Sequence, residues 1–311
     1  MLHNRVIILL KGCQSMNILV TGGTGFVGQF LSDTLIQNGH HVYILTRSPG
    51  AYTSDENKTY IDYYVDAQAL PSIHAVINLA GDTLFGYWTT SKKKAILHSR
   101  LEATERLIQM MNQMTVKPKV LINGSAVGYY GTSTEKMFTE KTTRPGDDFL
   151  AKVVVAWEKC AEQAASLGIR TVYTRFGVIL GKNHGALPLM SLPIKLFAGG
   201  KIGSGEQWIP WIHIDDVVQM IIFSIENEDL EGPINVTAPH PQRNKDFIKV
   251  LANVLKRPYW FPTPSPLLKI ALGDMSTLIT QGQYVLPHKA QAHDYLFKFS
   301  TVEAALEDIF S

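Results

Sequence analysis

A glycine-rich turn near the start of the chain has the residue types and spacing that bind a phosphate group. The segment reads Thr21-Gly22-Gly23-Thr24-Gly25-Phe26-Val27-Gly28. Gly22 allows a sharp turn, Gly25 lets a pyrophosphate approach the backbone, and Gly28 lets the next helix lie close to the preceding strand. Free N–H groups at the start of that helix attract phosphates. We therefore expect a dinucleotide cofactor to be bound by Gly22, Thr24, Gly25, Phe26, Val27 and Gly28.

The residues after the second apolar run indicate which dinucleotide binds. An NAD site usually has Asp or Glu there to hold the ribose 2′-hydroxyl. This chain has Thr46-Arg47-Ser48 instead, and the nearest acids, Asp55 and Glu56, lie well downstream. The Arg47 guanidinium can meet a 2′-phosphate, and Ser48 can add a hydroxyl. The alternative is that Arg47 is a solvated surface residue, but the pattern favours NADP over NAD.

The elements that must position these residues alternate between strand and helix. Apolar runs typical of buried parallel strands cover residues 17–21, 41–46, 74–80, 119–123 and 170–175, and helical spacing covers 26–37, 91–114 and 149–166. This alternation predicts an α/β fold with a Rossmann doubly wound parallel sheet, in a domain of residues 16–186. Residues 187–311 predict a smaller mixed substrate lobe toward the C-terminus. In this lobe we expect a helix at 215–225, with Asp215 or Asp216 near its start. We also expect a strand at 234–237 that returns to the main sheet.

Composition narrows the function classes. The chain has 311 residues, of which 45% are hydrophobic and 18% charged, so a sizeable core can form. A net charge of +2 does not indicate nucleic acid or a membrane surface as a partner. No apolar run reaches the length of about 18 residues that a membrane span needs. The two cysteines, Cys13 and Cys160, form no metal-binding pair, so a reducing, cytoplasmic location without structural metal is expected.

The first fifteen residues require a separate interpretation. Arg5 is followed by the apolar run Val6-Ile-Ile-Leu-Leu10, which is similar to a short signal-peptide core, but no small-residue cleavage site follows. Met16 stands one residue before the first predicted strand. We favour Met16 as the natural start, with residues 1–15 as an upstream extension, over a targeting segment.

Further motifs resemble a known superfamily. The glycine turn, Asn78-Leu-Ala-Gly81 and Ile212-His-Ile-Asp-Asp216 are similar to landmarks of the extended short-chain dehydrogenases/reductases. Within that superfamily, the chain more closely resembles an atypical branch, the nucleoside-diphosphate-sugar epimerase-like "epimerase family" proteins. The segments that carry this resemblance are Gly124-Ser-Ala-Val-Gly-Tyr-Tyr-Gly131, Trp157-Glu158, Arg175-Phe-Gly-Val-Ile-Leu-Gly181, Gly199-Gly-Lys-Ile-Gly-Ser-Gly205, Trp211-Ile-His-Ile-Asp215 and Asn235-Val-Thr-Ala-Pro239. The resemblance runs from Met16 to the C-terminus. Residues from about 255 to 311 resemble that branch's short C-terminal domain of unknown function.

The resemblance implies cofactor contacts beyond the glycine turn but not the usual catalysis. It places contacts at Thr46, Arg47, Leu79, Ala80 and Gly81. Standard members use a Ser, a Tyr-x-x-x-Lys pair and an Asn on the long helix, with the Tyr as general acid/base. Here only the serine remains, as Ser125, whereas Phe149, Val153 and Arg100 stand at the tyrosine, lysine and asparagine positions. Lys152 comes one residue early and would point about 100° away around the helix.

Other side chains could take over the missing roles. Tyr129 and Tyr130 follow Ser125 at the mouth of a predicted strand, where sites form in parallel sheets. His213 could act as an acid/base near neutral pH. Arg100 could orient the cofactor or a substrate anion. Each also has a structural interpretation, as a packing tyrosine, a hydrogen-bonded core histidine, a surface arginine or, for Ser125, a turn cap.

Two functions from different classes fit this sequence. The first is an NADP-dependent oxidoreductase or epimerase acting on a small molecule or nucleotide sugar, in which Ser125 polarises the reacting carbonyl and Tyr129, Tyr130 or His213 transfers the proton. The second is an NADP(H)-binding regulator or redox sensor without hydride transfer, because the Tyr and Lys are missing. Neither a nucleic acid nor a membrane partner is expected, and a homodimer is compatible with the fold.

Overall fold

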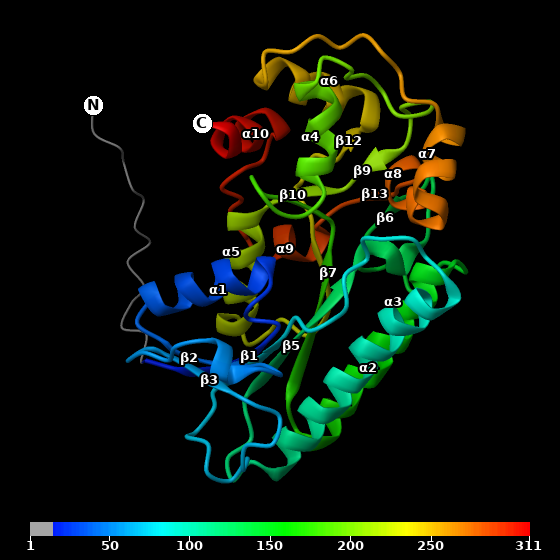
Figure 1. Ribbon diagram of the computed structural model, residues 1–311. Coiled ribbons are helices and arrows are strands. Elements are labelled where there is room, and N and C mark those ends of the chain that lie inside the picture. Colours follow the sequence, from blue (N-terminus) through cyan, green and yellow to red (C-terminus); the bar gives the residue numbers. More distant parts are fainter. Residues whose placement is uncertain (1–14) are drawn as a thin grey trace, which may run out of the picture.

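Seven parallel strands form the centre of the molecule (Figure 1). The computed structural model describes residues 15–311, so the predicted extension up to Gln14, with Cys13, lies outside the described residues. The strands are β1 (Asn17–Thr21), β2 (His41–Leu45), β3 (Lys58–Ile61), β4 (Ala75–Asn78), β5 (Val120–Ala126), β7 (Arg170–Phe176) and β11 (Gly232–Val236). Their order, β11-β7-β5-β4-β1-β2-β3, reverses between β1 and β4, which is where ligands bind in doubly wound sheets. The predicted fold class is confirmed.

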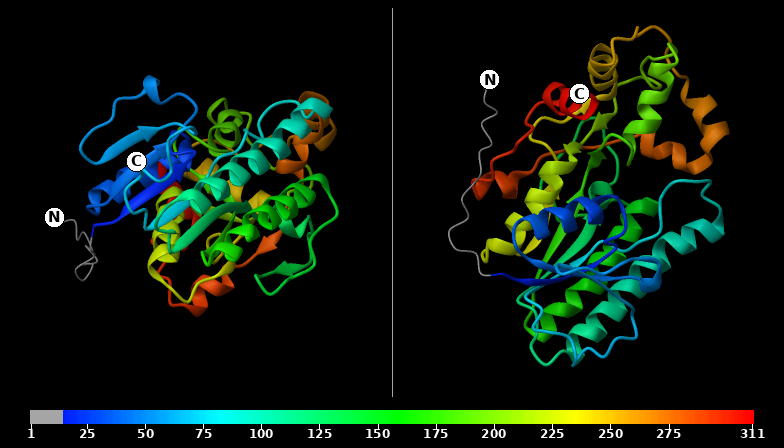
Figure 2. Two further views of the ribbon diagram at one scale, coloured as in Figure 1. Left: turned by 90° about the horizontal axis from the view of Figure 1, so that it is seen from below. Right: turned by 60° about the vertical axis from the view of Figure 1, so that its left-hand side comes forward.

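Two pairs of helices cover the faces of the sheet (Figures 1 and 2). On one face α1 (Phe26–Gln37) packs against α5 (Ile214–Glu226), and on the other α2 (Thr90–Gln113) packs against α3 (Phe149–Ala161). Successive strand side chains point to opposite faces. Ile18 and Val20 therefore join the core under α1 and α5, whereas Leu19 joins the core under α2 and α3.

Side chains at the helix starts explain where two of these helices begin. Thr89 accepts a hydrogen bond from the Lys92 backbone N–H, and Asp148 accepts one from the Ala151 N–H. Such caps satisfy N–H groups that have no partner within the helix. The predicted helix at 149–166 is an α-helix only to Ala161 and continues as a 3-10 helix over Glu162–Leu167.

Strand β3 lacks a strong sequence signal and was not predicted. It pairs with β2 at the edge of the sheet, and its side chains are only partly buried. Because an edge strand is covered less than a central one, polar residues such as Lys58 and Thr59 are tolerated there. The apolar run that predicts the other strands is therefore weak at this position.

A second core forms the lobe at the top of Figure 1. Its elements are β8 (Val178–Leu180), α4 (Leu187–Lys195), β9 (Trp208–Ile209), β10 (Trp211–His213), β12 (Gln242–Arg243), α6 (Asn244–Val254) and α10 (Val302–Phe310). β8 pairs with β10 in parallel, and β9 pairs with β12 antiparallel. Trp211, Phe247 and Leu306 are fully buried at its centre.

The predicted lobe of residues 187–311 contributes to both parts of the molecule. Its α5 covers the sheet, and β11 pairs with β7, so the predicted return of one strand to the main sheet is confirmed. The remaining elements are the 3-10 helices Pro49–Ala51, Val127–Tyr130 and Gly273–Ser276, together with β6 (Met137–Phe138), α7 (Ser265–Leu272), α8 (Thr277–Thr280), β13 (Tyr284–Val285) and α9 (His288–Ala292).

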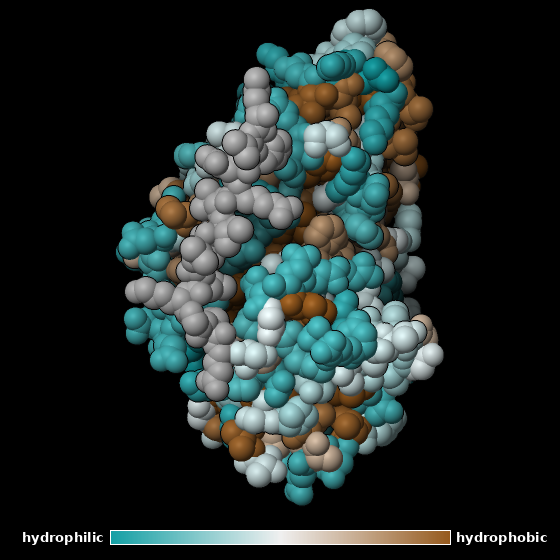
Figure 3. All heavy atoms as spheres, turned by 90° about the vertical axis from the view of Figure 1, so that its left-hand side faces the viewer, coloured by the Kyte–Doolittle hydropathy of each residue, from teal (hydrophilic) through white to brown (hydrophobic). Residues whose placement is uncertain are grey.

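Among the described residues visible in Figure 3, hydrophilic ones cover much of the surface, and hydrophobic ones gather toward the upper right and in smaller patches near the lower end. Within residues 15–311, none of the helices combines the length and the apolar character that crossing a membrane requires.

Candidate cofactor-binding and active site

The glycine turn between β1 and α1 has the geometry of a phosphate cradle. The Gly25 N–H donates to the Gly22 carbonyl at 2.9 Å, which closes the turn. Gly22 has a φ of +70°, and a Cβ there would come within 2.6 Å of the Leu79 carbonyl oxygen. A Cβ on Gly28 would collide with the backbone of Gly22. Only glycine fits these two positions, so the turn can pass close beside the end of β4.

The start of α1 leaves its N–H groups for a ligand. Gly25 is the N-cap and provides no side-chain hydrogen bond, and the first turn contains no acidic residue. An uncapped helix start of this kind attracts anions through its free N–H groups and the helix dipole. The turn and the helix start together have a geometry that suits the pyrophosphate of a dinucleotide.

Arg47 lies in the loop after β2, with an exposed side chain and no ion pair to any residue in the range 15–311. Beside it, the Ser48 N–H donates to the Thr46 hydroxyl at 3.4 Å. The downstream Asp55 accepts from the backbone N–H groups of Asn57 and Lys58 at 2.9 and 2.8 Å, which holds its carboxylate in its own turn. The guanidinium is thus available to a phosphate.

A cavity of about 490 Å³ extends from the glycine turn across the ends of β4 and β5. The predicted residues that line it are Gly22, Gly25, Phe26, Val27, Gly28, Leu79, Gly81, Arg100 and Ser125. Thr24, Thr46, Arg47, Ser48 and Ala80 lie outside its lining. Ala80 instead donates its N–H to the Thr21 hydroxyl at 3.3 Å.

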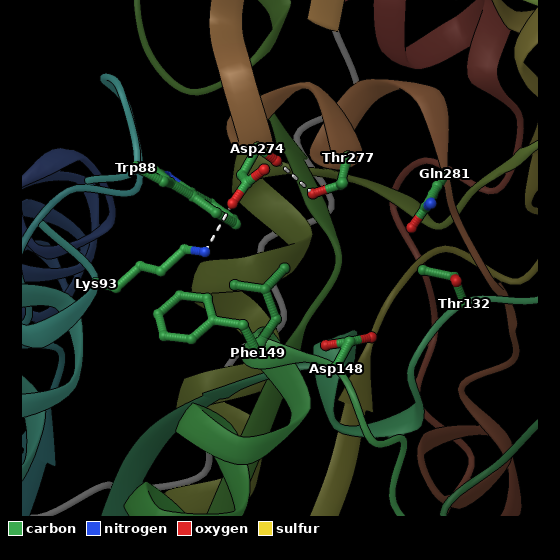
Figure 4. Close-up of a pocket in the computed structure, with 9 residues that line it drawn as sticks. Trp88, Lys93, Thr132, Asp148, Phe149, Asp274, Thr277 and Gln281 are labelled. Atoms are coloured by element: carbon green, nitrogen blue, oxygen red, sulfur yellow. Dashed lines mark hydrogen bonds and ion pairs between the residues drawn. The ribbon is translucent and has the colours of Figure 1, made fainter. Parts of the chain in front are cut away.

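A smaller pocket of about 150 Å³ continues the cavity (Figure 4). Thr132, Leu150, Thr277 and Gln281 line both spaces, so the two are contiguous. Phe149, at the usual tyrosine position, lines the small pocket and packs edge-on against Trp88, with ring centroids 5.6 Å apart.

The usual lysine position also lacks a proton-transfer group. Val153 is buried and lines the larger cavity, whereas Lys152 is exposed, as the helical geometry predicts. At the positions where the resemblance implies the tyrosine and the lysine, the two spaces are thus lined by Phe149 and Val153.

Ser125 belongs to a buried hydrogen-bond network that reaches beneath the cavity. Its hydroxyl donates to a carboxylate oxygen of Glu158 at 2.5 Å. Arg175 binds the same carboxylate with two nitrogens, each at 2.8 Å, and also donates to the Tyr130 hydroxyl at 3.0 Å. The Tyr130 hydroxyl in turn donates to the side-chain oxygen of Asn235 at 2.7 Å. Five elements are joined in this way: β5, the 3-10 helix Val127–Tyr130, α3, β7 and β11.

This network differs from the sequence expectation for Ser125. A serine hydroxyl can donate one hydrogen bond, and Ser125 donates it to Glu158. Ser125 therefore presents lone pairs to the cavity and would accept a hydrogen bond from a ligand. The expected role of polarising a carbonyl requires the opposite orientation and would break the bond to Glu158.

Arg175 and Tyr130 each keep one protonation state near neutral pH, for different reasons. Burial alone would lower the pKa of Arg175, but the hydrogen bonds and the negative charge of Glu158 raise it above its usual value. Burial raises the pKa of Tyr130 to about 12, although Arg175 acts in the opposite direction. Tyr130 is thus a poor proton donor at neutral pH, and its hydroxyl is occupied on both sides.

The other two proton-transfer candidates also lie away from the cavity. The Tyr129 hydroxyl donates to the Thr143 carbonyl at 2.7 Å, and the Arg175 guanidinium lies 3.5 Å above its ring. His213 lies at the end of β10, where its Nδ1 accepts from the Asp215 N–H at 3.1 Å and caps α5. Neither residue lines the cavity, and Tyr130 does not either. The arrangement gives the three residues structural roles.

We expect His213 to make the stability of the fold depend on pH. Burial lowers the pKa of His213 below its ordinary value of 6.5. Above that value the imidazole is neutral in the folded and unfolded states, so it adds no pH dependence. As the pH falls below about 6.5, the unfolded chain binds a proton that the folded chain resists, and stability falls by up to about 1.4 kcal/mol per pH unit.

Denaturant unfolding between pH 5 and 7 tests this expectation. His213→Asn keeps a side chain that can cap α5 but does not titrate, so it should flatten the profile. His288→Asn, at an exposed position, is the matched control. Equal slopes for the wild type and His213→Asn would show that His213 does not cause the dependence.

Three residues of the network, Glu158, Arg175 and Asn235, were not predicted as site residues. The sequence does contain a signal for the first two. Glu158 stands in an otherwise apolar stripe of α3, and Arg175 stands within a buried strand. A charge on a buried face must be paired, so two opposite charges of this kind suggest one ion pair. Thr277, Gln281 and Gln283, from the C-terminal segment, were also missed as residues of the cavity wall.

Known proteins are similar to this chain along most of its length. The family model described as "NAD dependent epimerase/dehydratase family" matches residues 18–237, and a second model, described as a "domain of unknown function", matches residues 263–309. The epimerase family protein YfhF of Bacillus subtilis is 48% identical over 300 residues, covering 95% of this chain and 98% of that protein. A Staphylococcus haemolyticus epimerase family protein is 43% identical, covering 94% and 98%.

A solved structure of an epimerase family protein has a fold similar to that of this chain. The crystal structure of human epimerase family protein SDR39U1 (isoform2) with NADPH is 32% identical, with a TM-score of 0.85, covering 95% of this chain and 99% of that one. The glycine turn and Ser125 lie within the part of the chain that the first family model matches, whereas Thr277, Gln281 and Gln283 of the cavity wall lie in the part that the second one matches. This chain belongs to the NAD dependent epimerase/dehydratase family.

Proposed function

We propose that this protein binds NADP(H) and uses it in an oxidoreductase or epimerase reaction on a small molecule, with a nucleotide sugar as one class of candidate. The observation that supports this most is the single cavity that joins the glycine turn to Ser125. A nicotinamide cofactor supplies hydride chemistry when bound. The turn positions its pyrophosphate, and Ser125 would then lie where the reacting end of the dinucleotide meets a substrate.

The preference for NADP over NAD rests on the residues after β2. Arg47 is exposed, has no ion pair to any of residues 15–311 and can bind a 2′-phosphate, whereas no carboxylate follows β2 directly to bind a 2′-hydroxyl. The human relative was crystallised with NADPH, which is consistent with this choice. Thr46 and Ser48 would flank the same phosphate.

Ser125 is proposed to position the substrate as a hydrogen-bond acceptor. The Ser125 hydroxyl donates its hydrogen bond to Glu158, and Arg175 holds that carboxylate in place, so the Ser125 lone pairs are fixed toward the cavity. A ligand hydroxyl or amine is the matching partner. Such fixed geometry contributes to catalysis by orienting the reacting group rather than by supplying a proton.

Turnover assays with Ser125→Ala test this role. Purified protein is incubated with NADPH and a panel of carbonyl compounds, and with NADP and the matching alcohols, while absorbance of the reduced cofactor is followed. Nucleotide sugars are incubated with the protein and NADP and analysed for the epimerised product, because an epimerase regenerates its cofactor and gives no net change in absorbance. Wild type should turn over at least one pair, and Ser125→Ala should slow it by about tenfold or more. Ser166→Ala, on the exposed end of the 3-10 helix Glu162–Leu167, is the matched control. Equal rates for Ser125→Ala and the wild type would contradict the role.

A non-catalytic NADP(H)-binding regulator is the second candidate. Phe149 and Val153 replace the usual proton-transfer pair, and Tyr129, Tyr130 and His213 do not line the cavity. A regulator should bind NADPH and change conformation or assembly without oxidising it. Steady cofactor oxidation with any compound of the panel would exclude this candidate, and tight binding without turnover across the panel would favour it.

A further inference from the structure

Of the residues in the described range 15–311 that line the large cavity, only Arg100 is charged. The rest of the lining is apolar or uncharged, including Ser125, Thr132, Thr277, Gln281 and Gln283. A guanidinium keeps its charge at any physiological pH. A cation placed in a largely apolar cavity costs free energy unless an anion meets it. This imbalance points to a ligand that brings the negative charge.

The protein holds the Arg100 guanidinium in place but leaves part of it free. Its Nη1 donates to the carbonyl oxygens of Asp82 and Ile96 at 3.1 and 2.9 Å. Its Cζ lies 5.2 Å from the centre of the Trp157 ring, and the missing Cβ of Gly81 leaves room for it. Within residues 15–311, Nε and Nη2 have no hydrogen-bond acceptor, so they keep donors for a ligand.

Nearby carboxylates are already engaged by other groups. Asp82 is paired with Lys92 at 2.8 Å, and Asp274 is paired with Lys93 at 2.7 Å across the smaller pocket (Figure 4). Asp148 accepts the Ala151 N–H at the start of α3. Burial lowers the pKa of Arg100, with Asp82 acting in the opposite direction, which is the sign of an incompletely compensated charge.

The order of the strands separates Arg100 from the phosphates of the cofactor. The glycine turn follows β1, and Arg47 follows β2, on one side of β1 in the sheet. Arg100 packs beside Gly81, after β4, and against Trp157, whose ring lies next to Gly124 of β5, on the other side. A dinucleotide whose pyrophosphate lies at the turn and whose 2′-phosphate meets Arg47 would leave Arg100 at its nicotinamide end.

We infer that Arg100 binds an oxyanion of the substrate, a carboxylate or a phosphate, beside the nicotinamide end of the cavity. The inference rests on the proposed function and names the substrate class: a small carbonyl or hydroxyl compound that carries a negative charge. Two parallel hydrogen bonds from Nε and Nη2 to two oxygens match the geometry of either group. Neutral compounds of the same size lack this contact.

Anion binding to the NADPH-saturated protein tests the inference. Saturation fills the phosphate sites at the glycine turn and Arg47, so they cannot bind the probe. Acetate and inorganic phosphate are titrated separately while NADPH fluorescence and heat are measured, with acetamide as the uncharged counterpart. The two anions distinguish a carboxylate from a phosphate substrate. The variants are Arg100→Gln, Arg100→Lys and, as a matched control on the exposed side of α2, Arg106→Gln.

The inference predicts that at least one anion binds to wild type and that acetamide does not. Arg100→Gln should lower the affinity for that anion by about tenfold or more and change the affinity for NADPH by less than about threefold. Arg100→Lys should retain part of the binding because it keeps the charge, and Arg106→Gln should behave as wild type.

Two results would overturn the inference. One is anion binding that is equal in wild type and Arg100→Gln, or absent from wild type. The other is a parallel loss of NADPH affinity in Arg100→Gln, which would assign Arg100 to the cofactor. Failure of NADPH itself to bind wild type would instead contradict the proposed function, so the two failures are distinguishable.

Discussion

Replacing Arg47 with alanine is expected to weaken the binding of NADPH by about tenfold or more while leaving NADH binding nearly unchanged. A hydrogen bond to a charged group contributes roughly 1.5–3 kcal/mol, which corresponds to about 10- to 150-fold in affinity. Arg47 has no carboxylate partner among residues 15–311, so its removal leaves no buried charge behind. The loss of affinity should therefore be confined to NADPH, which carries the 2′-phosphate.

The measurement is a pair of calorimetric titrations, with NADPH and with NADH, on wild type and Arg47→Ala. Arg47→Lys should keep part of the NADPH affinity because it retains the charge but not the planar fork. Arg144→Ala, which removes another exposed arginine, is the control. An equal loss for NADPH and NADH would show that Arg47 does not read the 2′-phosphate.

Removing the Glu158 carboxylate should produce the largest loss of stability of any change in the site. Glu158 binds both the Ser125 hydroxyl and the Arg175 guanidinium, and Arg175 is 3% exposed. Glu158→Ala leaves that guanidinium buried without its carboxylate, and breaking a buried ion pair costs about 3–5 kcal/mol. The change should also release the Ser125 hydroxyl.

Denaturant unfolding of three variants tests this. Glu162→Ala removes an exposed acid four residues further along the chain and should change stability by no more than about 0.5 kcal/mol. The double variant Glu158→Leu/Arg175→Leu removes both charges and should be less destabilised than Glu158→Ala. If Glu158→Ala is no less stable than Glu162→Ala, the ion pair does not hold these elements together.

The cofactor half of the site could be predicted because its signal is local. The glycine turn, the helix after it and Arg47 all lie within one strand–helix–strand unit, and glycine is required at Gly22 and Gly28 by close backbone contacts. The doubly wound sheet followed from apolar runs that a buried parallel strand requires. Where burial is incomplete, as at Lys58–Ile61, the same signal fails.

The substrate half could not be predicted from local patterns because distant segments meet there. Arg175 and Glu158 are 17 residues apart in the chain, and Tyr130 and Asn235 are 105 residues apart. Whether a tyrosine faces a cavity or such a network depends on which partners the fold brings to it. The sequence offered Tyr130 and His213 as proton donors, and the fold gives them a buried hydrogen bond and a helix cap. Gln281 and Gln283 enter the cavity wall from a segment that no strand–helix pattern links to the sheet.

Calorimetric titration of the wild-type protein with NADPH, and in parallel with NADH, tests the central claim most directly. The glycine turn, the uncapped start of α1 and Arg47 predict one NADPH site per chain, with NADPH bound about tenfold or more tighter than NADH. Absence of binding by either dinucleotide, or equal affinity for the two, would contradict the assignment of this turn and Arg47 as an NADP(H) site.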